Sequence, residues 1–343
     1  MKPIRSWFAA TIILSAVVGL EFGKSNVLVV LILGELMYGF VGLFSRYFYD
    51  LGMRSIDITF LRLFTITVVL LIVLLIAKRE LLKVKPMDLV FFVSFGVFKL
   101  LADVFYIFSI DYIPLALASV LQMMFPFYII VLSLLLFKEK IDLKKLVAIL
   151  VGFIGCTLIT GNLFATGRIE SMGIVAAMIS GLALSVYVLG GTFSFKRGYH
   201  PATYLLFSAM LSDLIALPFI QHDLVIETIT SLDVIPLIMG LGIVASLIPM
   251  FIEVWSARYL SPTVISIVSM VEVVSAAIIG VVAFDEVLDI LNIFGIALVL
   301  SSILIINIRI SIKAQKYFEE HPEVVERLKE EYGPKRSDGP DQE

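Results

Sequence analysis

Several charged and polar residues lie in the middle of long apolar stretches, where they could bind a solute or carry a proton. Glu35, Lys99, Gln122 and Glu272 are the deepest of them. At about 1.5 Å of rise per helical residue, each lies roughly 12 to 15 Å from the end of its stretch, near the middle of a bilayer. An ionisable group at that depth costs about 2.5 to 3.5 kcal/mol on insertion scales, so each needs a partner or a water-filled cavity.

The neighbours of two of these groups leave two interpretations open for each. Glu35 shares a helix face with Tyr38 and Gly39, which favours a site or proton-coupling residue, or else the partner of a buried cation. Lys99 is followed by Asp103 four residues later, so the two charges can neutralise each other on one face. The alternative for Lys99 is contact with a carboxylate or phosphate of a substrate.

The other two deep groups are also surrounded by polar or small residues. Glu272 shares its face with Ser269 and Ser275, which is too polar a face for lipid; the alternatives are a functional role and helix packing. Gln122 can orient a ligand or bond across helices, and Pro126, one turn later, frees a backbone carbonyl. All four deep groups are predicted to line one shared cavity.

Two further charged residues are interpreted as structural. Arg62 lies about 7 Å inside one membrane surface, from which its long side chain can snorkel outward. Glu253 lies near the end of its stretch, beside Trp255 and Arg258, and is expected to be an interfacial charge.

The composition is that of a polytopic membrane protein. Of 343 residues, 60% are hydrophobic and only 16% are charged, which excludes a soluble protein. The single cysteine, Cys156, excludes an intramolecular disulfide. Histidines occur only in connections or in the tail, which argues against an intramembrane metalloprotease, and no cofactor, metal or nucleic-acid partner is expected.

The hydropathy pattern predicts an all-α polytopic membrane protein, a ten-helix bundle with an extra short N-terminal hydrophobic helix. The predicted spans are 27–45, 58–77, 89–110, 114–137, 146–159, 173–195, 203–220, 234–257, 264–284 and 290–308. Residues 7–22 are short for a span and resemble the apolar region of a signal peptide; we favour an uncleaved helix, interfacial or crossing with its N-terminus outside.

An internal duplication divides the chain. Residues 112–142 align without a gap on 259–289, at a spacing of 147, and both copies carry F-x-E-x-x-D. The first turn is rich in lysine and the second has no Lys or Arg, so the two turns should face opposite sides of a membrane, as in inverted repeats. The predicted divisions are 1–26 (N-terminal segment), 27–161 (first five-helix repeat), 162–172 (linker), 173–308 (second repeat) and 309–343 (charged cytoplasmic tail).

The distribution of basic residues predicts the orientation. Segments assigned to the cytoplasmic side from residue 78 onward carry Lys78, Arg79, Lys83, Lys85, Lys138, Lys140, Lys144, Lys145, Lys196, Arg197, Arg258, Arg309, Lys313 and Lys316, whereas the outer connections carry only Arg46, Arg54 and Arg168. Positive residues stay on the cytoplasmic side, so we expect a multi-pass protein of the cell membrane with a cytoplasmic C-terminus.

These motifs resemble those of EamA-type members of the drug/metabolite transporter superfamily. The family pattern at the end of the fourth helix of each repeat is an apolar run with Pro, then a Glu, then two Gly. The first copy has Phe125-Pro126, Glu139, Ala148 in place of the first Gly, and Gly155; the second has Glu272-Val273 where the family often has Glu-Pro, then Glu286, Gly295, and Ser302 in place of the second Gly. Arg62 matches the arginine of the second helix. The resemblance covers residues 27–308 and implies ten helices in two five-helix repeats. It does not specify the substrate.

We therefore expect a secondary active transporter, not an enzyme, of small polar or amphipathic metabolites such as amino acids or related compounds. It would work by alternating access. ATP is not expected to drive it, since no nucleotide-binding motif is found. Protons are the candidate coupling ion, with Glu35 and Glu272 as the groups that would carry them. The residues expected to bind substrate or to couple are Glu35, Tyr38, Lys99, Asp103, Gln122 and Glu272. The alternative is a non-transporting membrane scaffold or receptor-like protein. The deep charges argue against this alternative, because a scaffold gains nothing from groups whose insertion into a bilayer costs free energy.

The opposite character of the two homologous turns gives a test of topology. In a Cys156→Ala background, Lys140→Cys should react with a membrane-impermeant maleimide only from the cytoplasmic side, and Val287→Cys only from outside. Labelling of intact cells and of inside-out vesicles measures this. Reaction of both cysteines from the same side would contradict the inverted-repeat prediction.

Overall fold

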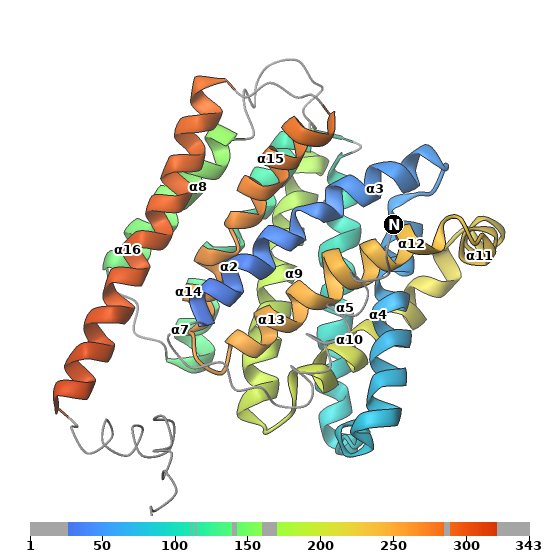
Figure 1. Cartoon of the computed structure of the whole chain (residues 1–343), viewed down its shortest axis with the longest axis horizontal. Helices are drawn as coiled ribbons and strands as arrows, with labels where there is room; N and C mark the ends of the chain where they lie inside the picture. Colours follow the sequence, from blue (N-terminus) through green and yellow to red (C-terminus); the bar gives the residue numbers. More distant parts are fainter. Residues whose placement is uncertain are drawn as a thin grey trace, which may run out of the picture.

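The regular elements of the described chain are helices (Figure 1). The computed structural model describes residues 27–110, 112–113, 115–138, 143–159, 170–284 and 289–320. The helices are α2 (Val27–Tyr38), α3 (Phe40–Asp50), α4 (Ser55–Ala77), α5 (Pro86–Ile110), α6 (Leu115–Gln122), α7 (Phe125–Phe137), α8 (Leu143–Ile159), α9 (Ser171–Lys196), α10 (Pro201–Ala216), α11 (His222–Thr230), α12 (Ile235–Met239), α13 (Ile248–Ser256), α14 (Pro262–Val268), α15 (Val271–Phe284) and α16 (Ile290–Glu320).

Short elements of other helical types complete this part of the chain. They are the 3-10 helices Arg79–Leu82 and Leu217–Phe219 and the π-helical segment Gly240–Leu247, which joins α12 to α13. The N-terminal helix predicted at residues 7–22, most of the linker, Glu139 and Glu286 lie outside the described residues.

Among the described residues, seven helical stretches are long and apolar enough to cross a membrane. They are Val27–Asp50, Ser55–Ala77, Pro86–Tyr106, Ser171–Lys196, Pro201–Phe219, Ile235–Ser256 and Pro262–Ala283. The other three predicted spans coincide with shorter apolar helices, which include Val120–Leu136 and Ile290–Ile305. The all-α prediction is confirmed, and the count of ten crossings stays a prediction.

Three of the predicted spans are interrupted, although the sequence analysis treated each as one helix. Gly39 separates α2 from α3. The fourth predicted span breaks at Met123 between α6 and α7, and the ninth breaks at Met270 between α14 and α15. These two methionines are the pair that the spacing of 147 aligns, so both copies break at the same place. In the first copy, Pro126 stands in the first turn of α7, where its missing N–H costs no helical bond.

The α4 and α10 helices pack antiparallel. The Nη2 atom of Arg54, just before α4, donates to the carbonyl of Phe219, just after α10, at 2.8 Å. Further along both helices, the hydroxyl of Thr67 donates to Oδ2 of Asp213 at 2.8 Å. Thr67 and Asp213 are 146 residues apart. This separation in sequence is close to the repeat spacing of 147, so α4 and α10 touch at nearly equivalent positions of the two halves.

The α8 and α16 helices lie side by side at the left of Figure 1 and also run antiparallel. Near the start of α16, the side-chain amide of Asn292 donates to the carbonyls of Leu158 and Ile159 at the end of α8. Between these ends, a Cβ on Gly155 would lie 2.7 Å from the carbonyl oxygen of Gly295, and a Cβ on Gly295 would lie 2.7 Å from that of Gly155. Only glycine permits this close approach of the two backbones.

His200 caps α10 as a neutral acceptor. Its Nδ1 accepts a hydrogen bond from the backbone N–H of Ala202 at 3.2 Å. Burial lowers the pKa of the imidazole to about 4, with smaller contributions from the positive charges of Arg258 and Lys78. The ring therefore keeps a free lone pair for the cap at neutral pH.

The glycine contact between α8 and α16 predicts a specific loss of stability. Gly155→Ala should destabilise the protein by about 1 to 3 kcal/mol, because the new methyl group meets backbone rather than a movable side chain. Thermal unfolding of purified protein in detergent, followed by tryptophan fluorescence, measures the effect. Gly42→Ala is the matched control, since nothing lies within 4 Å of a Cβ there. Equal unfolding temperatures for the two variants would contradict the close packing.

Candidate functional site

The interruptions in the helices lie next to the polar residues that the sequence singled out. Glu35 and Tyr38 come just before Gly39, Gln122 is the last residue of α6, and Glu272 lies in the first turn of α15. Interrupted helices expose backbone groups that need polar partners, and transporters use such places for binding. Part of the candidate site therefore lies at three helix breaks.

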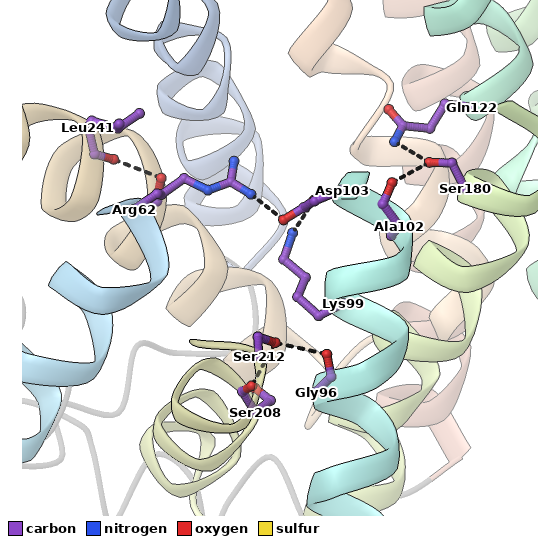
Figure 2. A network of polar contacts seen from close by, with 11 residues as sticks. Arg62, Gly96, Lys99, Ala102, Asp103, Gln122, Ser180, Ser208, Ser212 and Leu241 are labelled. Carbon is purple, nitrogen blue, oxygen red and sulfur yellow. Dashed lines mark hydrogen bonds and ion pairs between the residues drawn. The ribbon is translucent and has the colours of Figure 1, made fainter. Parts of the chain in front are cut away.

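The centre of the site is an ion triad on α4 and α5 (Figure 2). Arg62 Nη2 lies 2.7 Å from Asp103 Oδ2, and Lys99 Nζ lies 2.9 Å from Asp103 Oδ1. The three side chains are only 12%, 7% and 14% exposed for Arg62, Lys99 and Asp103. Lys99 Nζ also lies 5.5 Å above the ring of Tyr187 from α9. Each oxygen of the Asp103 carboxylate thus binds one cation.

The position of Arg62 corrects the sequence analysis, which expected it to snorkel toward the membrane surface. Its guanidinium turns inward because Asp103 offers a buried anion, and a charge-assisted hydrogen bond in a dry site is stronger than one to surface water. Its Nε–H, however, is buried without a hydrogen-bond partner among the described residues.

Gln122 lies on the other side of α5, where it ties three helices together. Figure 2 shows its side-chain amide donating to the hydroxyl of Ser180 on α9, at 2.8 Å, while that hydroxyl donates to the carbonyl of Ala102 on α5, at 2.6 Å. Ala102 is the neighbour of Asp103. The predicted bond across helices is thus made by Gln122.

Glu35 lies where two helix breaks meet. Its Oε1 accepts a hydrogen bond from the hydroxyl of Ser269, between α14 and α15, at 3.0 Å, and the residue is 1% exposed. Close by, the hydroxyl of Ser275 donates to the carbonyl of Leu36 at 2.6 Å. The serines that flank Glu272 in sequence therefore face α2.

Glu253 on α13 also belongs to this group. Its neighbours in sequence pack against other helices of the site: a Cβ on Gly34 of α2 would lie 3.2 Å from Ile252, and one on Gly191 of α9 would lie 3.3 Å from Val254. The Glu253 carboxyl is close enough to the charges of Glu35, Lys99 and Glu272 to interact with them.

The prediction that Glu253 is an interfacial charge is wrong. Its distance from the end of the helix was judged correctly, since α13 ends at Ser256. However, distance from an end does not tell which side of a helix a residue faces, and Glu253 faces the bundle. Ser256, three residues later on the same face and fully buried, is the signal that could have indicated this.

The charged residues of the site include more carboxyl groups than cations. It contains four carboxyl groups (Glu35, Asp103, Glu253 and Glu272) and two cations (Arg62 and Lys99), so its formal charge is −2 when all six are ionised. Both cations are paired with Asp103. Within the described part of the chain, Glu253 and Glu272 have no ion pair within 4 Å, and Glu272 lies in the field of both cations.

The triad predicts a large effect of one isosteric change. Asp103→Asn leaves two buried cations without an anion and should destabilise the protein by about 3 to 5 kcal/mol. Unfolding in detergent measures it, with Asp233→Asn, an exposed residue before α12, as the control. If Asp103→Asn unfolds at the wild-type temperature, the triad does not hold α4 against α5.

Comparisons with known proteins agree with this architecture. The model of the EamA-like transporter family matches residues 25–161 and again 171–308. An uncharacterized transporter of Archaeoglobus fulgidus is 27% identical over 80% of this chain and 94% of its own length. The pseudopaline exporter CntI of Pseudomonas aeruginosa is 27% identical over 58% of this chain and 68% of its own.

One solved structure, a crystal structure of a protein, superposes with a TM-score of 0.69 at 18% identity. It covers 83% of this chain and 98% of its own, and it shows a shared fold alone. The two family matches cover both halves of the chain. The chain is a multi-pass membrane protein and belongs to the EamA-like transporter family.

Proposed function

We propose that the protein is a secondary active transporter of small polar or amphipathic metabolites, such as amino acids or related compounds, and that it works by alternating access in the cell membrane. The observation that carries the proposal is the group of four carboxyls and two cations inside the bundle. A scaffold gains nothing from a net charge placed inside a bilayer, whereas a carrier needs groups that change partner during its cycle.

The contacts between matching helices support the alternating-access part of the proposal. If the two halves are inverted repeats, a two-fold axis in the membrane plane relates them, and equivalent residues can touch only where that axis passes between two helices. The contact of Thr67 with Asp213, 146 residues apart, fits such a position on α4 and α10. The antiparallel α8 and α16 fit the same relation, and rocking of one repeat against the other would expose the site to either side.

Proton coupling is proposed for Glu35 and Glu272. A net charge of −2 in an apolar interior is unfavourable, so carboxyls without an ion-pair partner gain by taking up protons when no solute is bound. Asp103 is already neutralised by Arg62 and Lys99 and has no such need. Because one relative is an exporter, outward transport is the direction to test first.

The coupling role predicts a separation of two activities. Glu272→Gln imitates the protonated acid, so it should abolish solute accumulation driven by a pH gradient while leaving solute exchange across the membrane intact. Proteoliposomes loaded with a metabolite mixture, with and without an imposed pH gradient, measure both activities, and the exposed Glu227→Gln is the control. If both activities survive in Glu35→Gln and in Glu272→Gln, these acids are structural and proton coupling at this site is wrong.

A further inference from the structure

Each half of the chain has a helix break that is hydrogen-bonded to the first helix of the other half. In the first half, the side-chain amide of Gln122, at the end of α6, donates to the hydroxyl of Ser180 on α9, at 2.8 Å (Figure 2). In the second half, the hydroxyl of Ser269, at the break between α14 and α15, donates to Oε1 of Glu35 on α2, at 3.0 Å. Gln122 stands 147 residues before Ser269, which is the spacing of the two aligned copies. The two cross-half bonds therefore start from equivalent positions.

The cross-half bond of Gln122 has a fixed direction. The amide N–H of Gln122 can only donate, and the single proton of the Ser180 hydroxyl goes to the carbonyl of Ala102 on α5, at 2.6 Å. Neither an amide nor a serine hydroxyl titrates in the physiological pH range. This bond therefore does not respond directly to the uptake of a proton.

The cross-half bond of Ser269 can reverse its direction. The hydroxyl has one proton and two acceptors within reach, which are Oε1 of Glu35 at 3.0 Å and the carbonyl of Ile265, one turn earlier in α14, at 3.2 Å. An ionised Glu35 only accepts, so the Ser269 proton then points to it. A protonated Glu35 has an O–H that needs an acceptor, and Oγ of Ser269 can accept it while its own proton turns to Ile265. Both forms of Glu35 thus keep a hydrogen bond with the same residue.

The surroundings of Glu35 make this hydrogen bond important. Glu35 is 1% exposed and Ser269 is 6% exposed, so bulk water does not replace a lost bond. The titratable groups that face Glu35 are Tyr38 from α2 itself, Glu253 from α13 and Glu272 from α15, none of which carries a positive charge. The other elements packed on α2, α14 and the π-helical segment, contain no charged residue. Among the described residues, Ser269 is therefore the neighbour that can satisfy both forms of this carboxyl.

We propose that Ser269 is the positioning residue for the coupling proton of Glu35. It holds Glu35 against the break between α14 and α15 in both protonation states. On uptake, one proton from water in the transport pathway joins Oε1 of Glu35, and the Ser269 hydroxyl turns from Oε1 to the carbonyl of Ile265. The new O–H bond of Glu35 is the only covalent bond that forms. The proposal rests on the proposed proton coupling and adds a residue to it.

The two cross-half bonds then differ in their response to a proton. The bond of Gln122 contains no titratable group, whereas the bond of Ser269 contains Glu35. Protonation therefore acts on the break of the second half and leaves the equivalent break of the first half unchanged. Such a difference between the halves lets one proton favour opening toward one side of the membrane.

Infrared titration of the full-length protein in phosphatidylcholine vesicles tests this role without any solute. The band of the protonated Glu35 carboxyl is identified by its absence in Glu35→Gln, and its intensity is followed as the pH is changed. Hydrogen bonds to charged groups are about twice as strong as neutral ones, so Ser269→Ala should favour the protonated form. Its proton affinity should rise roughly fivefold and its band should shift in frequency. Ser269→Thr keeps the hydroxyl and should restore both wild-type values.

Ser266→Ala is the matched control for the loss of a buried hydroxyl from α14. Ser266 is fully buried, and its hydroxyl donates within the helix to the carbonyl of Thr263, at 3.0 Å. This variant should titrate as the wild type. In Ser269→Ala the carbonyl of Ile265 keeps its bond from the backbone N–H of residue 269, at 2.9 Å, so the variant should elute as wild type in size-exclusion chromatography.

Three infrared results would overturn the role of Ser269. They are a Glu35 band that does not titrate in the wild type, an unchanged band and affinity in Ser269→Ala, and an equal change in Ser266→Ala. Each of these results concerns the Glu35 carboxyl alone and can be obtained whether or not the protein transports a solute.

The failure of this proposal and of the proposed function can be told apart in proteoliposomes loaded with the metabolite mixture. Ser269→Ala should lower accumulation driven by a pH gradient and leave solute exchange intact. Unchanged accumulation in this variant overturns the role of Ser269 and leaves proton coupling standing. Exchange without any accumulation in the wild type overturns proton coupling, and the role of Ser269 with it. The absence of any solute movement overturns the transporter function.

Discussion

The Asp103 carboxylate, held between Arg62 and Lys99, is the interaction on which the arrangement of the central helices depends. It pairs with Lys99 within α5 and also joins α4 to α5, because Arg62 of α4 has its buried anion on the other helix. Neutral hydrogen bonds also tie α5 to its neighbours: the carbonyl of Gly96 accepts from Ser212 of α10, at 2.8 Å, and that of Ala102 accepts from Ser180 of α9. α5 thus makes a polar contact with each of α4, α9 and α10.

A different kind of contact holds the periphery of the bundle. Where α8 meets α16, Gly155 and Gly295 bring two backbones together without any side chain between them, and the surrounding core is apolar. Association of helices in lipid gains from such close packing because lipid itself competes for apolar surface. The bundle therefore combines a tightly packed pair of helices with a polar centre in which several groups lack a fixed partner.

The sequence predicts how deep a charged residue lies in the membrane better than it predicts which side of its helix faces the other helices. Counting residues from the ends of the apolar stretches placed Glu35, Lys99 and Glu272 at one depth, and the structure brings their charges within reach of one another. The spacing of Lys99 and Asp103 was enough to indicate their pairing. These inferences succeed because they use only the rise of a helix and its period, which are local properties.

The errors have one cause, which is that the side a helix turns toward its neighbours depends on residues far away in the chain. Arg62 turns inward because of an acid 41 residues later, and Glu253 faces α2, more than 200 residues earlier. No proline in the sequence indicates the helix break at Met270, whereas Pro126 follows the equivalent break in the first copy. Packing between distant helices decides these features, and no single stretch of sequence contains that information.

The excess of acid over base also constrains how such a site can work. A carrier must return across the membrane empty, and an empty site with a charge of −2 would have to move that charge through an apolar barrier. Two protons, or two positive charges on a solute, make the site neutral in either state. Protons are then the occupants that make the empty site neutral on the return step. The excess of two carboxyls over cations sets the upper limit of the number of protons carried.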